Sequence, residues 1–271
     1  MKPELIFYSG ASLLEGPCWD PLYEVLYCVS IEQKIIYRIN PENGFVNSYQ
    51  TESEVGCAVI DDKGMILEAE TNGIYRLNPD NGKREFLIQA IQEPDMRYND
   101  GKFDPAGRFL VGTKGLTKDH PGLGKLYSFD GCTTTTIITG TTISNGLGFS
   151  SDQKWMYFID TPTRKIGRYK YDINTGKALF DKYVVEITDG GLPDGMCVDA
   201  ADMIWVAEWG GSKVSHWNPD TGIKTDEINL PCINISSCCI GGKNNELLFI
   251  TTAKSDFDEF LAGGLFAVRI K

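Results

Sequence analysis

Asn40-Pro41-Glu42-Asn43-Gly44 is the first of four similar turn sequences in this chain. Related pentapeptides follow at residues 78–82 (Asn-Pro-Asp-Asn-Gly), 172–176 (Asp-Ile-Asn-Thr-Gly) and 218–222 (Asn-Pro-Asp-Thr-Gly). Each ends in a glycine, which is free to take the positive φ that a tight turn requires. The pentapeptides therefore predict a hairpin that is repeated along the chain.

Short runs of alternating apolar residues stand on both sides of these turns and recur throughout the sequence. They predict β-strands, because alternation with a period of two places one face of a strand against a core. No stretch of a dozen or more residues keeps the 3.6-residue apolar period of a helix. The chain is therefore predicted to be all-β, with strands at 25–29, 35–39, 65–69, 73–77, 108–112, 126–129, 155–159 and 166–171.

A longer repeat groups these strands into units. In each unit a bulky residue ends a first strand, a turn follows, and a strongly apolar second strand comes next. The bulky residues stand 41, 43, 46, 49 and 42 residues apart, within the range of about 40 to 50 residues for a four-stranded propeller blade. We predict one domain over residues 1–271, a six-bladed β-propeller of four-stranded antiparallel blades. The six positions are Trp19, Ile60, Phe103, Phe149, Val198 and Ile240.

The last blade needs a strand from elsewhere in the chain. After Ile240 only two further strand-like runs remain, at 247–251 and 264–270. A propeller is a ring that must close, so the N-terminal run Leu5–Tyr8 is predicted to complete this blade.

The first strand of each blade lines the central channel, so one fixed offset should gather side chains around the axis. Four residues before the bulky positions, two carboxylates and two carboxamides would converge. Buried like charges are tolerated only with a cation or strong hydrogen bonds, and an all-oxygen set favours Ca²⁺, Mg²⁺ or Mn²⁺, with Zn²⁺ as a further candidate. Arg97 lies two residues earlier in the third blade, on the same strand face. The residues at the offset are Glu15, Gly56, Asn99, Asn145, Asp194 and Ser236.

Two plainer interpretations stay open at this point. A propeller channel can be lined by polar residues that hold only water. The pairs Asp100-Gly101, Asn145-Gly146 and Asp194-Gly195 also match ordinary turn chemistry.

Composition excludes several classes of function. The 271 residues carry 26 Lys and Arg against 37 Asp and Glu, a formal net charge of −11, which argues against binding nucleic acid or an anionic membrane. No apolar run approaches the roughly 20 residues of a spanning helix, and the N-terminus lacks a signal-peptide pattern, so we expect a cytoplasmic protein. The 8 cysteines form no C-x-x-C pair and are expected to be buried, reduced thiols.

Five segments in order along nearly the whole chain resemble the signature segments of the regucalcin and gluconolactonase family, which includes senescence marker protein and luciferin-regenerating enzyme. The family fold is a six-bladed propeller, and its known members hydrolyse sugar lactones to aldonic acids. The segments are Glu15-Gly-Pro-Cys-Trp19, Arg97-Tyr-Asn-Asp-Gly-Lys-Phe-Asp-Pro-Ala-Gly-Arg-Phe109, Ser144-Asn-Gly-Leu147, Leu192-Pro-Asp-Gly-Met-Cys-Val-Asp199 and Ser237-Cys-Cys-Ile-Gly-Gly-Lys-Asn244.

The resemblance implies a role for each matching site residue. Glu15, Asn145 and Asp194 would bind one divalent metal ion, Ca²⁺ first among the candidates, while Arg97 and Asn99 would contact the substrate. The metal would polarise the lactone carbonyl and activate a water molecule, with Asp194 as the general base. Arg97 and Asn99 would position the sugar hydroxyls and stabilise the developing oxyanion.

The stretch from Lys114 to Gly124 departs from the family's animal members, which tend to carry acidic residues there. It is predicted to be a long, glycine-punctuated loop at one end of a blade, and two interpretations remain open. As a lid over the channel, its Lys118, Asp119 and His120 would help to select the sugar. Otherwise it is a mobile connection without a substrate role.

Three functions compete at this stage. The first is a metal-dependent lactonase whose partner is a small sugar lactone, and the second is a non-catalytic calcium-binding regulatory protein. The third is a propeller esterase that acts on non-sugar esters. A ring closed by its own N-terminal strand leaves only short blade edges, so we expect a monomer.

Overall fold

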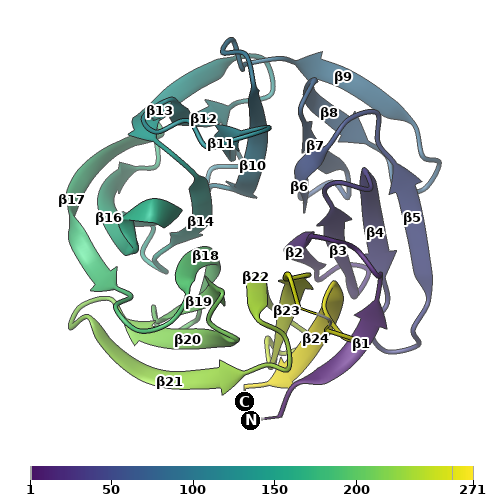
Figure 1. The fold of residues 1–271 in the computed structure, drawn as a ribbon. Helices are drawn as coiled ribbons and strands as arrows, with labels where there is room; N and C mark the ends of the chain where they lie inside the picture. The colour runs from purple at the N-terminus through teal and green to yellow at the C-terminus, as the bar shows by residue number, and fades with distance from the viewer. Residues whose placement is uncertain (1, 258, 271) are drawn as a thin grey trace.

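The strands assemble into six four-stranded antiparallel sheets around a central channel (Figure 1). The computed structural model describes residues 2–257 and 259–270. Six innermost strands surround the channel: β2 (Leu14–Asp20), β6 (Val55–Ile60), β10 (Met96–Phe103), β14 (Ser144–Phe149), β18 (Leu192–Val198) and β22 (Asn234–Gly241). The prediction of an all-β, six-bladed propeller is confirmed.

Each blade runs outward from its innermost strand. The second strands are β3 (Val25–Ser30), β7 (Ile66–Glu70), β11 (Phe109–Gly115), β15 (Trp155–Asp160), β19 (Ile204–Trp209) and β23 (Leu247–Ala253). The third strands are β4 (Ile35–Ile39), β8 (Gly73–Leu77), β12 (Gly124–Phe129), β16 (Lys165–Asp172), β20 (Lys213–Asn218) and β24 (Gly264–Arg269). The outermost strands are β5 (Val46–Gln50), β9 (Arg84–Ile88), β13 (Thr134–Thr141), β17 (Lys177–Glu186), β21 (Ile223–Asn229) and β1 (Glu4–Tyr8).

The N-terminal strand closes the ring. β1 pairs antiparallel with β24, with Glu4 opposite Ala267 and Tyr8 opposite Gly264, so both ends of the chain belong to one blade (Figure 1). The prediction that residues 5–8 complete the last blade is confirmed.

The four pentapeptides join the third and outermost strands of their blades. In each turn the glycine amide donates to the carbonyl of the first residue, as from Gly44 to Asn40 at 2.9 Å. The glycines take φ values of +69° to +73°, the left-handed conformation that favours glycine. The sixth blade has no such turn because its outermost strand comes from the other end of the chain.

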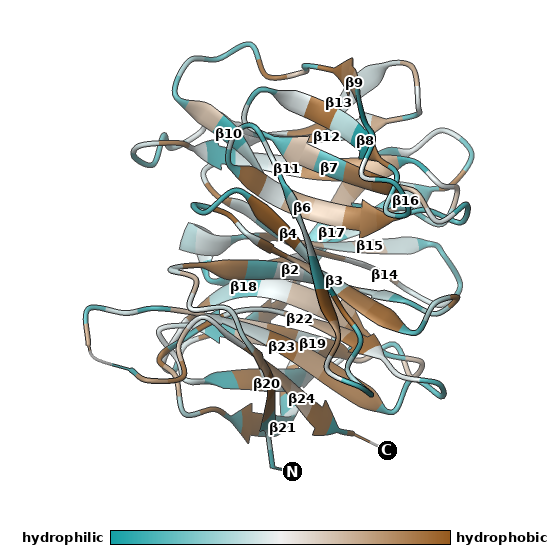
Figure 2. Cartoon of the chain, turned by 90° about the vertical axis from the view of Figure 1, so that its right-hand side faces the viewer, coloured by the Kyte–Doolittle hydropathy of each residue, from teal (hydrophilic) through white to brown (hydrophobic). Residues whose placement is uncertain are grey.

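The core lies between neighbouring blades. All six residues of β3 are buried, whereas four of the five residues of β5 are exposed. Leu26 and Cys28 of the first blade pack with Phe249 and Leu265 of the sixth in one buried cluster, so apolar packing holds the closing blades together. Most hydrophobic colour lies on the strands and most hydrophilic colour on the loops (Figure 2).

Each innermost strand carries a β-bulge at the offset that sequence analysis placed in the channel. A bulge leaves backbone unpaired and re-aims a side chain, which is why bulges are common beside functional sites. The pairs at 100–101, 145–146 and 194–195 lie at these bulges within strands, so the turn interpretation is wrong for them. The register shifts fall between Glu15 and Cys18, Val55 and Cys57, Tyr98 and Gly101, Asn145 and Leu147, Pro193 and Met196, and Ile235 and Ser237.

Helix is almost absent from the part of the chain that the structure describes, where the one helical element is a 3-10 turn at Thr161–Thr163. None of its helices has the length and apolar character needed to cross a membrane. The eight cysteines are all free thiols; Cys132 is exposed, Cys18 is half-buried and the other six are buried. The expectation of reduced thiols is confirmed, and that of burial holds except at Cys132.

Candidate functional site

All five residues predicted to bind the metal or the substrate line one cavity of about 240 Å³, close to where the innermost strands begin. They come from four different blades: Glu15 from β2, Arg97 and Asn99 from β10, Asn145 from β14 and Asp194 from β18.

The two remaining positions of the ring contribute no ligand group to the cavity. Gly56 has no side chain. The Ser236 hydroxyl is turned to protein partners, donating to the Leu14 carbonyl at 2.6 Å and contacting Thr251 Oγ1 at 2.9 Å. The cavity is therefore asymmetric, with its polar groups on four of six blades.

A chain of hydrogen bonds orients the two carboxamides. Arg97 Nη1 donates to Asn99 Oδ1 at 2.9 Å, and Asn99 Nδ2 donates to Asn145 Oδ1 at 2.8 Å. Asn145 Nδ2 in turn donates to Thr161 Oγ1 at 2.9 Å, and the Thr161 hydroxyl donates to the Pro193 carbonyl at 2.8 Å. Because a carbonyl oxygen has two lone pairs, Asn145 Oδ1 keeps one for a further partner.

The two carboxylates of the cavity are held in an environment that opposes their charge. Removal from bulk water, followed by repulsion from Asp100, raises the pKa of Glu15 to about 8. Burial, followed by repulsion from Glu15, raises the pKa of Asp194 well above its usual range. The Asp194 carboxylate accepts no hydrogen bond from any described residue, and its residue is 6% exposed.

This donor set fits a hard divalent cation. Two carboxylates and one carboxamide offer oxygen atoms alone, the ligands that Ca²⁺ and Mg²⁺ take, and a cation would offset the repulsion between Glu15 and Asp194. In the described parts of the chain no three His, Cys, Asp or Glu side chains form a metal-binding group. The third predicted ligand is accordingly an asparagine, Asn145.

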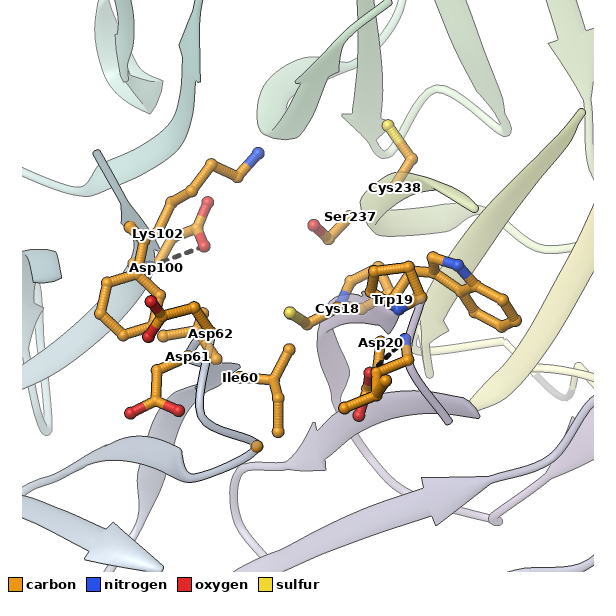
Figure 3. Close-up of a pocket in the computed structure, with 18 of the residues that line it drawn as sticks. Cys18, Trp19, Asp20, Ile60, Asp61, Asp62, Asp100, Lys102, Ser237 and Cys238 are labelled. Atoms are coloured by element: carbon orange, nitrogen blue, oxygen red, sulfur yellow. Dashed lines mark hydrogen bonds between the residues drawn. The ribbon is translucent and has the colours of Figure 1, made fainter. Parts of the chain in front are cut away.

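Asp100 is a site residue that sequence analysis missed. Its carboxylate lies beside Lys102 at a second cavity of about 500 Å³ in the channel, across from Cys18 and Ser237 (Figure 3). Gly101 N donates to Asp100 Oδ1 at 2.8 Å, and burial raises the pKa of Asp100 while Lys102 lowers it. The charge of Asp100 acts on both carboxylates of the first cavity, because it raises the pKa of Glu15 and of Asp194. In the sequence, only its position directly after Asn99 pointed to this role.

Lys114 is a second missed residue. The expected loop begins later than predicted, because β11 continues to Gly115 and places Lys114 in the strand, opposite Arg97 of β10. Lys114 lines the cavity with Arg97, and Thr161 and Trp209 also contribute to its wall. The register of β10 against β11 could have revealed this pair, but it depends on a bulge that sequence does not show.

The candidate lid residues have different environments. Asp119 lines the cavity although it is exposed. His120 is turned away, with its Nε2 atom 2.7 Å from Asp95 Oδ2, and Thr117 Oγ1 donates to Asp95 Oδ1 at 2.7 Å. Lys118 is exposed, and no described residue makes a hydrogen bond or ion pair with its side chain. Asp95 thus ties the loop to the segment before β10, and a lid role stays a prediction.

These features define a class: a six-bladed β-propeller with an oxygen-lined, acidic cavity where its innermost strands meet. Residues 13–254 match the family model described as the SMP-30/Gluconolactonase/LRE-like region. The chain belongs to this family, as its signature segments indicated.

Individual relatives agree with this assignment. Pentonolactonase XacC of Haloferax volcanii is 35% identical over 252 residues, which cover 92% of this chain and 84% of that protein. The 6-deoxy-6-sulfogluconolactonase of Pseudomonas putida is 33% identical over 266 residues, covering 94% and 90%. A solved structure described as a calcium-binding protein, regucalcin, from Agrobacterium tumefaciens has a TM-score of 0.91 at 22% identity, covers 97% of this chain and 92% of that one, and supports the fold.

The raised pKa of Glu15 predicts how stability changes with pH. Between about pH 4.5 and 8 the folded, metal-free protein retains a proton that the unfolded chain releases, so its stability falls as pH rises through this window. The pKa of Asp194 is also raised, so this group likewise lowers the stability of the metal-free protein as pH rises. We expect the melting temperature of the EDTA-treated protein to be lower at pH 8.5 than at pH 5.5, and added Ca²⁺ to restore it at pH 8.5.

Glu15→Gln is the matched control, because it keeps the side-chain volume and removes the titrating group. The variant should show a flatter pH dependence and little recovery with Ca²⁺. Equal pH dependence in the variant and the natural protein would rule out this role for Glu15.

Proposed function

We propose that this chain is a divalent-metal-dependent lactonase that opens a small sugar lactone to its aldonic acid. One observation carries the proposal: Glu15 and Asp194 face a single cavity in which burial and mutual repulsion oppose their charge, beside Arg97 and Asn99. Two similar proteins are named as sugar lactonases, which supports the same reaction class.

The reaction adds water across the ring ester: a hydroxyl group bonds to the carbonyl carbon, and the ring oxygen leaves and gains a proton. When bound, a divalent ion supplies polarisation of the carbonyl and a lower pKa for water. Asp194, whose carboxylate has no hydrogen-bond donor among the described residues, accepts the proton from water and returns it to the ring oxygen. The Arg97 guanidinium stabilises charge that develops on the carbonyl oxygen.

In this proposal Asn99 and Asn145 position the substrate and the ion and transfer no proton. Asn99 is held between Arg97 and Asn145 by hydrogen bonds of 2.9 and 2.8 Å, so its amide is fixed before the substrate arrives. Asn145 would hold the ion through Oδ1, which keeps a lone pair free after accepting from Asn99. The all-oxygen donor set suits several hard ions; Ca²⁺ is our first choice because a similar solved structure is described as a calcium-binding protein, and Mg²⁺, Mn²⁺ and Zn²⁺ are the alternatives to test.

A panel of aldonolactones, assayed with a pH indicator with and without EDTA, tests this function. We expect acid release that EDTA abolishes and that one of the four ions restores. Calcium binding without turnover would instead indicate a regulatory protein like regucalcin. Turnover confined to aryl esters would indicate a propeller esterase, and either result would overturn the proposal.

A further inference from the structure

Two cations lie directly opposite each other in the wall of the candidate site. Arg97 of β10 and Lys114 of β11 are cross-strand partners in an antiparallel pair, and both line the cavity. Like charges at such positions are destabilising, and burial increases their cost. Burial lowers the pKa of both groups, and Arg97 lowers the pKa of Lys114 further. The fold therefore keeps Arg97 and Lys114 together although this position disfavours the charged form of both side chains.

Arg97 is largely committed to partners within the protein. Its Nη1 atom donates to the Tyr98 carbonyl at 2.8 Å and to Asn99 Oδ1 at 2.9 Å, and its Nε atom lies 3.6 Å from a carboxylate oxygen of Glu54. These contacts fix the guanidinium plane beside Asn99. They account for the position of Arg97, but they offer nothing to Lys114.

Lys114 lacks such partners. Its ammonium makes no hydrogen bond or ion pair with any residue that the structure describes, and the charges that favour it belong to Asp119, Asp194 and Glu15. A divalent ion would offset Glu15 and Asp194. Glu54 offsets the charge of Arg97 from outside the lining, and Asp119, the remaining carboxylate of the lining, makes no ion pair with Lys114. Of the two cations that line the cavity, only Lys114 then lacks a direct anionic partner among the described residues.

The size of the cavity limits which anions can reach the Lys114 ammonium. Its volume of about 240 Å³ is below the range of about 300 to 1,000 Å³ that holds drug-sized ligands, so it fits a single small sugar. In so small a cavity, an acidic group on the molecule that presents the lactone lies close enough to pair with Lys114.

We propose that the substrate is a sugar lactone carrying a second, acidic group, a carboxylate, sulfonate or phosphate, which Lys114 binds opposite Arg97. This inference deepens and rests on the proposed lactonase function. Lys114 is then the residue that selects charged over neutral lactones, and the reacting carbonyl stays with Asp194 and Arg97.

Matched lactones test the inference directly. We expect kcat/KM for 6-phosphoglucono-1,5-lactone to exceed that for neutral glucono-1,5-lactone, and that for glucaro-1,4-lactone to exceed that for neutral glucono-1,4-lactone, by about tenfold or more, as a charge-assisted hydrogen bond would give. Comparing the two acidic lactones shows whether phosphate or carboxylate is preferred. In Lys114→Met this preference should disappear, because KM should rise more for the acidic lactones than for the neutral ones.

Two further variants serve as controls. Lys114→Arg keeps the charge and should retain most of the preference. Lys254→Met removes a charge from an exposed lysine next to β23 that does not line the cavity, and the preference should persist. Circular dichroism and the melting temperature establish that each variant is folded.

The outcomes separate this inference from the proposed function. The anion subsite would be overturned if kcat/KM were equal for neutral and acidic lactones and fell equally for both in Lys114→Met. The proposed lactonase function would then still stand. If no lactone is hydrolysed, the function fails, and calorimetric binding of 6-phosphogluconate and gluconate decides the subsite. Tighter binding of 6-phosphogluconate that Lys114→Met removes would support it, and equal binding would overturn it.

Discussion

In the Asp194→Asn variant, we expect lactone hydrolysis to fall by at least about a thousandfold and calcium binding to be lost. The substitution keeps the shape of the side chain and removes the carboxylate that we assign both to the ion and to proton transfer. General acid–base catalysis contributes about 10² to 10⁴ in rate, and loss of the ion would add to this. Initial rates and calorimetric titration with Ca²⁺ measure the two effects.

Asp80→Asn is the matched control, because Asp80 is an exposed residue of the 78–82 turn. It should retain activity and calcium binding. Burial opposes the charge of Asp194 in the metal-free protein, so Asp194→Asn should not lower the melting temperature measured in EDTA. Hydrolysis within about tenfold of the natural protein would contradict the assignment of Asp194 as the base.

Gly56→Ala should destabilise the propeller more than Gly44→Ala, although both substitutions add a single methyl group. A Cβ atom there would overlap the Tyr98 carbonyl and lie 2.8 Å from the Asn99 carbonyl oxygen, and both are backbone atoms of the neighbouring blade. Backbone cannot rotate away as a side chain can, so we expect a loss of about 2 to 3 kcal/mol. For a domain of this size that corresponds to a melting temperature lower by about 4 to 10 °C.

The same change should reduce activity, because any shift of β10 moves Asn99 relative to Asn145. Gly44→Ala provides the comparison: its Cβ would meet no atom within 4 Å, and its cost comes from a φ of +73° alone, about 1 kcal/mol. Thermal unfolding of both variants separates crowding from backbone strain. A smaller loss for Gly56→Ala than for Gly44→Ala would show that the blades can move apart there.

Most of the fold was accessible from local patterns. The pentapeptide at 40–44 and its three relatives depend on residues within a few positions of one another, and the spacing of the bulky strand ends gave the number of blades. The same spacing placed Glu15, Asn99, Asn145 and Asp194 at one level of the channel. Their convergence could be predicted because the blades repeat, so that equal offsets reach equal places.

The missed residues follow from strand bulges and strand register, which local sequence patterns do not show. Each innermost strand contains a bulge, and a bulge shifts which side chains point into the channel. Asp100 was interpreted as turn chemistry although it lies in such a bulge, and Lys114 was placed in a loop although it belongs to β11. His120 was a candidate for substrate contact, but its ring nitrogen lies 2.7 Å from Asp95, on a segment that sequence did not connect with the loop.

Sequence alone determined the ring of six blades, its closure by residues 5–8, the family and the oxygen-rich level of the channel, because short-range turns and a regular spacing encode them. Only the tertiary structure decided which charges share the cavity. The opposition of Arg97 and Lys114 depends on strand register, and the effect of Asp100 on Glu15 and Asp194 depends on burial. The first arises from strand pairing within the third blade and the second from the packing of several blades around the channel, so no local pattern carries either.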